Sequence, residues 1–228
     1  MKDIFFLFLS ISFVSKIPAQ IPVYISGMEG HKSYRILAII KNSNGDLLVF
    51  AESRVSGSND FGDINILLKK STDKGKTWGS ITVVDNNDLQ AGNPAPVLDD
   101  SDPKFPNGRI FLFYNTGNNH EGEVRKGNGL REVWYKTSTD GGFIWSEGVN
   151  ITIQAHQPNQ LSVNPAYNFK EDWRHYANTP GLAMQFKEGK YKGRIYVAAN
   201  HSASKPQKMA EDYFHTVSIL MTMGQPSS

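Results

Sequence analysis

The sequence contains no cysteine and no long run of like-charged residues. Without cysteine, neither a disulfide framework nor a cysteine-type zinc site is available. The 24 basic and 22 acidic residues leave a formal net charge of +2 and are spread along the chain, so nothing resembles a nucleic-acid-binding arm. We therefore expect no nucleic-acid partner, and any affinity for an anion should be local to one site.

A third absence is a long apolar segment. The run from Ile4 to Val14 is shorter than the ~20 residues that a membrane-spanning helix needs, so no stable membrane span is expected. The run is typical of a secretory signal peptide over residues 1–20, and we expect an exported protein (secreted, periplasmic or at the cell surface) whose domain covers residues 21–228. The alternative is a buried N-terminal strand or helix.

The composition is nevertheless that of a folded protein. Of the 228 residues, 39% are hydrophobic and 11% aromatic, which is enough for a substantial core in one or two domains. The 6 histidines show no metal-ligand spacing, so we expect no catalytic metal and no cofactor.

The pattern along the chain is that of short strands separated by turn signals, with no long helical period. Clusters of Pro, Gly, Asn and Asp lie between the apolar segments, as in the turn at residues 42–46. The sequence thus predicts an all-β meander, with strands at Tyr34–Ile40, Leu47–Glu52, Ile64–Lys70, Ile81–Val84, Arg109–Tyr114 and Glu132–Thr137.

One segment occurs twice. Residues 71–78 read Ser-Thr-Asp-Lys-Gly-Lys-Thr-Trp, and residues 138–145 read Ser-Thr-Asp-Gly-Gly-Phe-Ile-Trp, an offset of 138 − 71 = 67. Asp73 and Asp140 can accept backbone N–H bonds across their own turns, the glycines allow positive φ, and we expect each Trp to pack under its hairpin. Such a turn is a folding device.

The pattern Ser-x-Asp-x-Gly-x-x-Trp is the Asp-box of sialidases and other propellers, and further motifs accompany it. They are Tyr-Arg-Ile at residues 34–36, Phe-Ala-Glu-Ser-Arg at 50–54, an Asp six residues later, Gly-Asn-Pro-Ala-Pro-Val at 92–97, and residues 193–202. In this order the chain resembles an exo-α-sialidase from about residue 30 to about residue 215. The resemblance implies a six-bladed β-propeller, represented here by about its first three blades.

The resemblance also implies an activity, the hydrolysis of terminal α-linked sialic acid from glycoproteins, glycolipids or oligosaccharides with retention at the anomeric carbon. Sialic acid carries a carboxylate, which guanidinium groups bind well. Arg35 matches the first arginine of the family's carboxylate-binding triad, although Leu37 stands where the family usually has proline. Arg54 matches an arginine that lies near the acid and helps to set its charge environment.

Asp60 matches the acid/base carboxyl of the family. A glycosidase needs a proton donor for the leaving oxygen, and the spacer at residues 55–59 would place Asp60 on a loop over the pocket. As a bare sequence feature, an Asp in such a loop is more often a turn residue. Asp63 is the weaker candidate for the same role.

Other positions have both a functional and a structural interpretation. Asn93 matches a position that lines the family's pocket for the N-acyl arm, but an Asn before Pro is otherwise a turn residue. Residues 118–121 lie on a loop in the same region. His201 lies at a strand end that faces the pocket in the family, although histidines in such places usually bond only to backbone.

The family places its Tyr nucleophile, the paired Glu and the other two triad arginines in later blades, beyond residue 228 of this chain. We therefore expect an incomplete domain that is inactive in isolation. The hypothesis from a different class is a non-catalytic glycan-binding or structural Asp-box propeller, because the chain carries only one triad arginine and no nucleophile pair.

Overall fold

The computed structural model describes residues 20–85, 90–168, 173–178, 181 and 183–202, and the backbone of residues 213–221. The predicted signal peptide lies outside the described residues except for its last position. Within the described part, no helix is long and apolar enough to cross a membrane.

The described chain forms three antiparallel sheets of four strands each, which we call blades 1, 2 and 3 in chain order. Blade 1 contains β1 (Ser33–Lys41), β2 (Leu47–Arg54), β3 (Ile64–Ser71) and β4 (Thr82–Asp85). Blade 2 contains β5 (Ala91–Asp99), β6 (Arg109–Gly117), β7 (Arg131–Ser138) and β8 (Val149–Asn150). Blade 3 contains β9 (Tyr176–Asn178), β10 (Met184–Gln185), β11 (Ile195–Ser202) and β12 (Tyr213–Met221).

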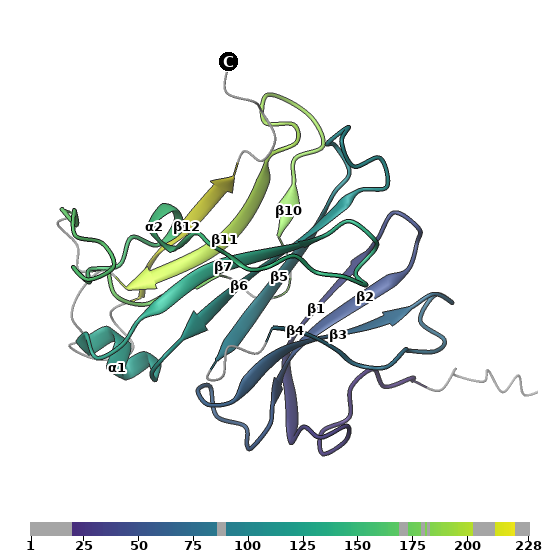
Figure 1. Ribbon diagram of the computed structural model, residues 1–228, viewed down its shortest axis with the longest axis horizontal. Helices are drawn as coiled ribbons and strands as arrows, with labels where there is room; N and C mark the ends of the chain where they lie inside the picture. Colours follow the sequence, from purple (N-terminus) through teal and green to yellow (C-terminus); the bar gives the residue numbers. More distant parts are fainter. Residues whose placement is uncertain are drawn as a thin grey trace, which may run out of the picture.

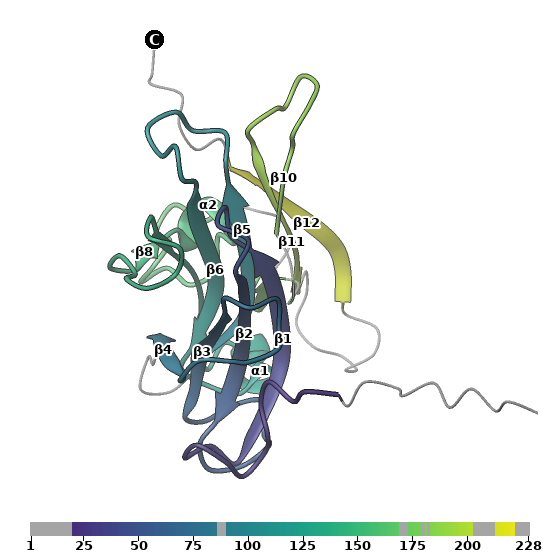
Figure 2. The same ribbon diagram turned by 90° about the vertical axis from the view of Figure 1, so that its right-hand side faces the viewer.

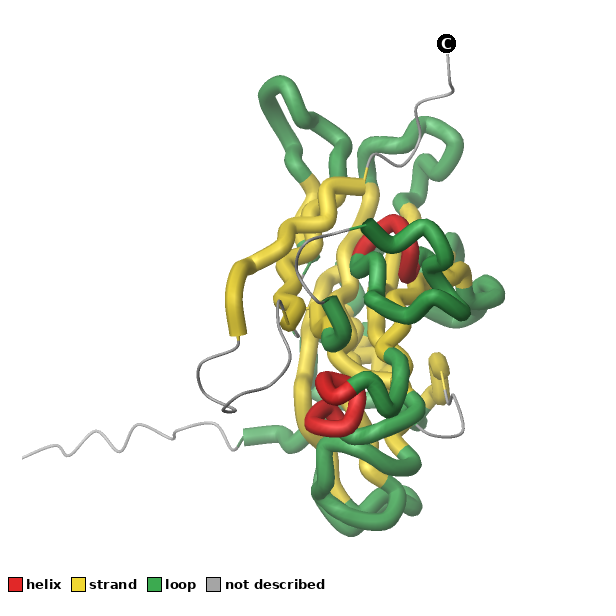
Figure 3. Tube along the Cα trace, turned by 90° about the vertical axis from the view of Figure 1, so that its left-hand side faces the viewer, coloured by secondary structure: helices red, strands yellow, loops and turns green. Residues whose placement is uncertain are grey.

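Blade 2 lies between the other two blades (Figure 1). In Figure 2, blades 1 and 2 both run from their first strand on the right to their last strand on the left. Blade 3 departs from the consecutive order, because β9 and β10 both pair with β11. The stacking of four-stranded antiparallel sheets is the arrangement of propeller blades. The helices α1 (Glu121–Lys126) and α2 (Thr152–Ala155) are short and lie in the connections outside the sheets (Figure 3).

The hydrophobic core consists of two clusters, each lying between neighbouring blades. One joins blades 1 and 2 and includes Phe50 and Leu112, whereas the other joins blades 2 and 3 and includes Phe113 and Val197. Because each blade is buried on the faces that meet a neighbour, the central strands are almost continuously buried. The blades are therefore stabilised mainly by packing against each other.

The expected strands of blades 1 and 2 are confirmed with small shifts at their ends, and so is the prediction of about three blades. The prediction omitted β5, whose Gly-Asn-Pro-Ala-Pro sequence reads as a loop. Pro94 is tolerated because the ladder shifts at a bulge between Gly92 and Ala95, and Pro96 because β5 is an edge strand of its sheet. The first strand of blade 1 has the same kind of bulge, between Arg35 and Ala38.

Both repeated turns form as predicted. The Asp73 carboxylate accepts the backbone N–H groups of Lys76 and Thr77 at 3.0 and 2.9 Å, and Asp140 makes the corresponding bonds with Phe143 and Ile144. The tryptophan of the second turn reaches further than expected. Trp145 packs edge-on against Phe50 of blade 1, with ring centroids 5.8 Å apart, so this turn also joins two blades.

Candidate active site

Charged side chains gather where β1 begins and β2 ends. Arg35 and Arg54 both donate from Nη1 to the same oxygen, Oδ1 of Asp60, at 2.9 and 2.8 Å. The second carboxylate oxygen of Asp60 makes no hydrogen bond with the described residues, and 81% of the side chain is exposed. The structure therefore brings together three residues that the sequence singled out, and shows that both arginines can bind one carboxylate.

The loop that carries Asp60 is tied down at several points. Its base is closed by the bond from Val55 N to the Asp63 carbonyl (3.1 Å), and Ser33 donates to the Gly57 carbonyl at 2.7 Å. Arg54 binds the loop backbone as well, at the carbonyls of residues 58 and 59. Asp63 thus serves the loop through its backbone, and its side chain does not line the large cavity beside Arg54.

Arg54 is the buried member of this group. Only 4% of its side chain is exposed, and Nη2 donates to Glu52 Oε2 at 2.8 Å. Burial opposes the charged guanidinium, but the hydrogen bonds with Glu52 and Asp60 outweigh that effect and raise the pKa of Arg54. Arg35 is the accessible member, with 47% of its side chain exposed.

The large cavity, of about 390 Å³, opens beside this group and is lined by both Arg54 and Asp60. Its size falls within the range of sites for small molecules. Its other walls come from the three blades and α1 and combine apolar with polar side chains. The apolar ones include Ile36, Phe61 and Tyr176, and the polar ones Gln90, Asn93, Asn115, Glu121, Arg131 and His175.

Three titratable side chains of the cavity wall, Glu121, Arg131 and His175, have shifted pKa values. Burial raises the pKa of Glu121, which lies near the cations Arg125 and Arg131. Burial lowers the pKa of Arg131 and brings that of His175 to about 3, so this histidine is neutral at ordinary pH. Phe61 and His120 also line the cavity, with ring centroids 4.9 Å apart.

Asn93 lies in the bulge of β5 with a φ of +54°, in the left-handed region that Asn tolerates better than most residues. Its backbone is held from both sides: N–H donates to Glu52 Oε1 at 2.7 Å, and the carbonyl accepts from the Asn178 side chain. Its own side-chain amide makes no hydrogen bond with the described residues, and the residue lines the cavity. The amide is therefore available to a ligand.

The sequence analysis did not assign Glu52 or Arg131 to the site, and it placed Glu121 in the region only as part of the loop at residues 118–121, of which His120 and Glu121 line the cavity. Glu52 lies two positions before Arg54, and the alternation of side chains along a strand puts both on one face, so this residue could have been found. Arg131 begins a strand on another blade, and no local pattern connects it to Arg54. His201 lies away from the cavity lining and packs against Trp173, with ring centroids 3.7 Å apart.

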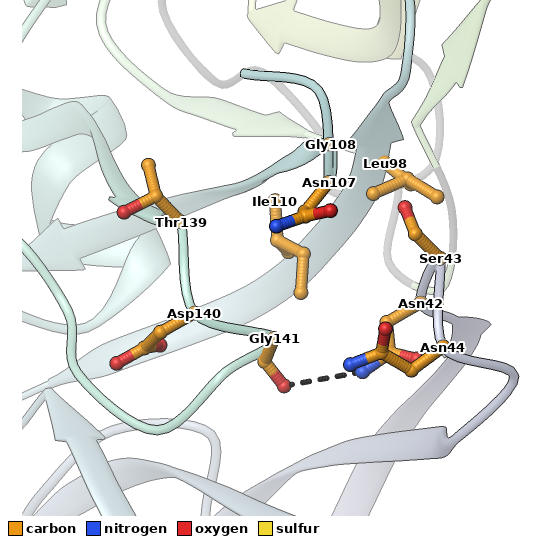
Figure 4. A pocket seen from close by; sticks show the side chains of 10 residues that line it. All are labelled: Asn42, Ser43, Asn44, Leu98, Asn107, Gly108, Ile110, Thr139, Asp140 and Gly141. Carbon is orange, nitrogen blue, oxygen red and sulfur yellow. Dashed lines mark hydrogen bonds between the residues drawn. The ribbon is translucent and has the colours of Figure 1, made fainter.

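A second cavity, of about 240 Å³, lies at the other ends of the same strands (Figure 4). It is lined by the β1–β2 turn, the connection between β5 and β6, and the second Asp-box turn. Asn42 joins the first of these turns to the last by donating to the Gly141 carbonyl at 3.4 Å. Its one carboxylate, Asp140, already accepts hydrogen bonds within its own turn. This cavity contains no paired acid and cation, so the larger cavity is the better candidate for chemistry.

Among the residues that the structure describes, no group of three or more His, Asp and Glu side chains is arranged to bind a metal ion. The side chains of the larger cavity offer a guanidinium group for an anion, a carboxyl at the rim, and amides for neutral polar groups.

Comparison with known proteins decides the family. The sequence profile of the BNR repeat-like domain matches residues 45–215. The chain belongs to the BNR-repeat sialidase family. Over 182 residues, which make up 75% of this chain and 25% of the relative, it is 31% identical to a sialidase from Micromonospora viridifaciens. It is also 31% identical over 145 residues to an exo-alpha-sialidase from Arthroderma benhamiae, covering 54% of this chain and 34% of that protein.

A solved structure shows that this sialidase-family chain has the corresponding fold. The Hadza microbial sialidase Hz136 superposes with a TM-score of 0.62 at 21% identity, over 84% of this chain and 38% of the other. The fold is accordingly an all-β propeller of the sialidase type. The chain spans about a quarter to a third of the length of these two curated relatives.

Proposed function

We propose that the protein is an exo-α-sialidase, which hydrolyses terminal α-linked sialic acid from glycoproteins, glycolipids or oligosaccharides. One observation carries the proposal: Arg35 and Arg54 converge on the Asp60 carboxylate at the rim of a cavity of about 390 Å³. Family membership supports the same function. Retention at the anomeric carbon is part of the proposal.

Arg35 binds the carboxylate of the substrate in this proposal. It is the more accessible of the two arginines and already holds a carboxylate, that of Asp60. A substrate anion that takes this place displaces Asp60 from Arg35, and the displaced acid is then available for the leaving oxygen. Binding of the anion and release of the acid are thereby linked.

Asp60 then protonates the leaving oxygen as general acid, a role that typically contributes about 10²–10⁴ in rate. Arg54, fixed by Glu52, stays beside the acid, and the unpaired amide of Asn93 binds the substrate further inside the cavity. Arg54 suits its role because its position is fixed, and Asn93 suits its role because its side-chain amide has hydrogen-bonding groups to spare.

The nucleophile in this proposal comes from outside the described residues. Tyr176 lines the cavity, but burial raises its pKa, which disfavours the phenolate, and its hydroxyl has no partner among the described residues to act as a base. A Tyr paired with a Glu would approach the anomeric carbon as a nearly neutral group and avoid repulsion by the substrate carboxylate.

The test is hydrolysis of α-sialosides by this chain and by any longer product of its gene. Asp60→Asn should lower turnover by about 10²–10⁴ on natural glycans, whose leaving groups need protonation, and much less on a substrate with a good leaving group. Asp63→Asn is the matched control and should leave both activities unchanged. Full activity of Asp60→Asn on natural glycans would exclude this role.

Sialoside binding without hydrolysis in every form would favour the alternative of a glycan-binding propeller. Export also belongs to the proposal, because the substrates named are largely found outside cells. It can be checked by determining the N-terminal residue of the protein recovered from the producing cells, with residues 20–21 as the expected start.

A further inference from the structure

The carboxylate of Glu52 accepts two hydrogen bonds, one from its own blade and one from blade 2. One oxygen accepts from Arg54 Nη2 at 2.8 Å and the other accepts from the backbone N–H of Asn93 at 2.7 Å, and the residue is only 3% exposed. The approach to blade 2 is so close that a Cβ at Gly92 would lie 2.5 Å from the carboxylate. Glu52 thus connects the buried arginine of blade 1 to the first strand of blade 2.

Blade 2 repeats half of this arrangement. Arg35 pairs with Glu52 in the β1–β2 ladder, and Gly92 pairs with Asn115 in the β5–β6 ladder, so Asn115 is the structural equivalent of Glu52. Its Oδ1 accepts the backbone N–H of Asn178, on the next blade, at 3.0 Å. We call this bond between consecutive blades the latch. A neutral amide is sufficient for the latch, so the latch does not explain a buried negative charge at position 52.

The negative charge of Glu52 is explained by its partner, the residue two positions later in the same strand. In blade 1 that residue is Arg54, whereas in blade 2 it is Gly117. Arg54 therefore lies between two carboxylates, buried Glu52 and exposed Asp60. By neutralising Arg54, Glu52 weakens the attraction between Arg54 and Asp60, because a cation shared by two anions binds each less tightly.

Resting on the proposed sialidase function, we propose that Glu52 is a positioning residue: one oxygen fixes Asn93, and the charge limits the hold of Arg54 on Asp60 so that the acid can leave the arginines and carry a proton. Asp60 also faces Arg35 from β1 and, across the cavity, Glu121 from α1. Arg131 of β7 lies close enough to interact with both Glu52 and Glu121. Of these groups, Glu52 is the one that shares Arg54 with the acid.

The decisive variant is Glu52→Gln, which retains an oxygen for the Asn93 N–H but removes the charge. The pH at which the Asp60 carboxyl is half protonated, followed by carbon-13 NMR of the purified chain, should fall by about half to one pH unit. Asn115→Ala is the matched control: it breaks the equivalent latch without a change of charge, and should lower stability while leaving the Asp60 midpoint in place. If Glu52→Gln does not fold, Glu52→Asn, which copies the residue in blade 2, gives the same measurement.

An Asp60 midpoint that is unchanged in the charge-free variants, or equally shifted in Asn115→Ala, would overturn the proposal. This titration needs no turnover, so it is separate from the test of sialidase activity. In a form that hydrolyses sialosides, Glu52→Gln should move the alkaline limb of the pH–activity profile down by the same half to one unit, about three- to ten-fold at high pH, because the acid is lost earlier. A loss of activity that is uniform at all pH values would indicate a merely structural role and overturn it as well.

Discussion

Blades 1 and 2 have nearly the same backbone and very different chemistry. Each has a bulged first strand, a residue with a φ of +54° in that bulge (Ile36 and Asn93), and an Asp-box turn after the third strand. Leu37 of blade 1 occupies the place of Pro94 of blade 2, so the bulge forms without the family's usual proline. Beside the Asp60 carboxylate, however, blade 1 places Arg35 where blade 2 has Gly92.

The comparison shows which residues build a blade and which make a site. Residues shared by the two blades, such as Phe50 and its equivalent Phe113, are buried between sheets. Residues that differ, such as Arg54 and its equivalent Gly117, lie at the ends of their strands that are nearer the cavity. A β-branched residue at positive φ, as at Ile36, is strained, and it directly follows Arg35. Blade 1 therefore carries the charged residues of the site on a backbone arrangement that blade 2 forms without such residues.

The largest effect is expected where the blades are alike. Phe50→Ala and Phe113→Ala each remove a side chain that is 1% exposed or less, and each should lower the free energy of unfolding by about 3–5 kcal/mol. Urea unfolding of the two variants measures this directly. Very unequal losses would break the equivalence of the two blades.

An effect on stability of the same size is expected at a position where the two blades differ. Arg54→Ala leaves Glu52 buried without its cation and should cost about 3–5 kcal/mol. The double change Glu52→Asn with Arg54→Gly copies blade 2 and should recover a large part of that loss, since no buried charge remains. If the double variant is no more stable than Arg54→Ala, the charge pair is not what separates the blades.

A moderate effect is expected in the repeated turns at low pH. Hydrogen bonds from Thr77, its backbone N–H and Ser71 lower the pKa of Asp73 from 3.8 to about 2. A carboxyl with a depressed pKa stabilises the fold above its unfolded value, and the contribution is lost as the pH falls from about 4 toward 2. Asp73→Asn should flatten the pH dependence of the melting temperature in that window. Asp140→Asn should do the same, because its pKa is also lowered by turn hydrogen bonds that outweigh burial.

The smallest effect on stability belongs to Arg35. Its bond to Asp60 joins two exposed side chains, so Arg35→Ala should change the free energy of unfolding by less than about 1 kcal/mol. Sialoside affinity should nevertheless fall sharply, because a charge-assisted bond to the substrate carboxylate is lost. Calorimetric titration with an α-sialoside, beside urea unfolding, separates the two quantities. A large loss of stability would mean that Arg35 supports the fold.

Much of this architecture can be predicted from the sequence, because it depends on interactions between residues close together in the chain. The strands around the turn at residues 42–46 and the two Asp-box turns follow from alternation and turn chemistry, which act within a few residues. Arg35, Arg54 and Asp60 were singled out by the resemblance to the sialidase family, and the structure brings the three together. The strand β5 was not predicted, because its prolines are typical of a loop and the bulged strand forms only through its pairing with β6.

The sequence by itself determined the all-β class and the repeated turns, since each depends on neighbours along the chain, and its resemblance to the sialidase family singled out Arg35, Arg54 and Asp60. Only the tertiary structure decided that Glu52 binds Asn93 on the next blade, that Trp145 packs on Phe50, and that Glu121 and Arg131 complete the cavity. These contacts join segments that are far apart in sequence, and they form because the blades bury their faces against each other.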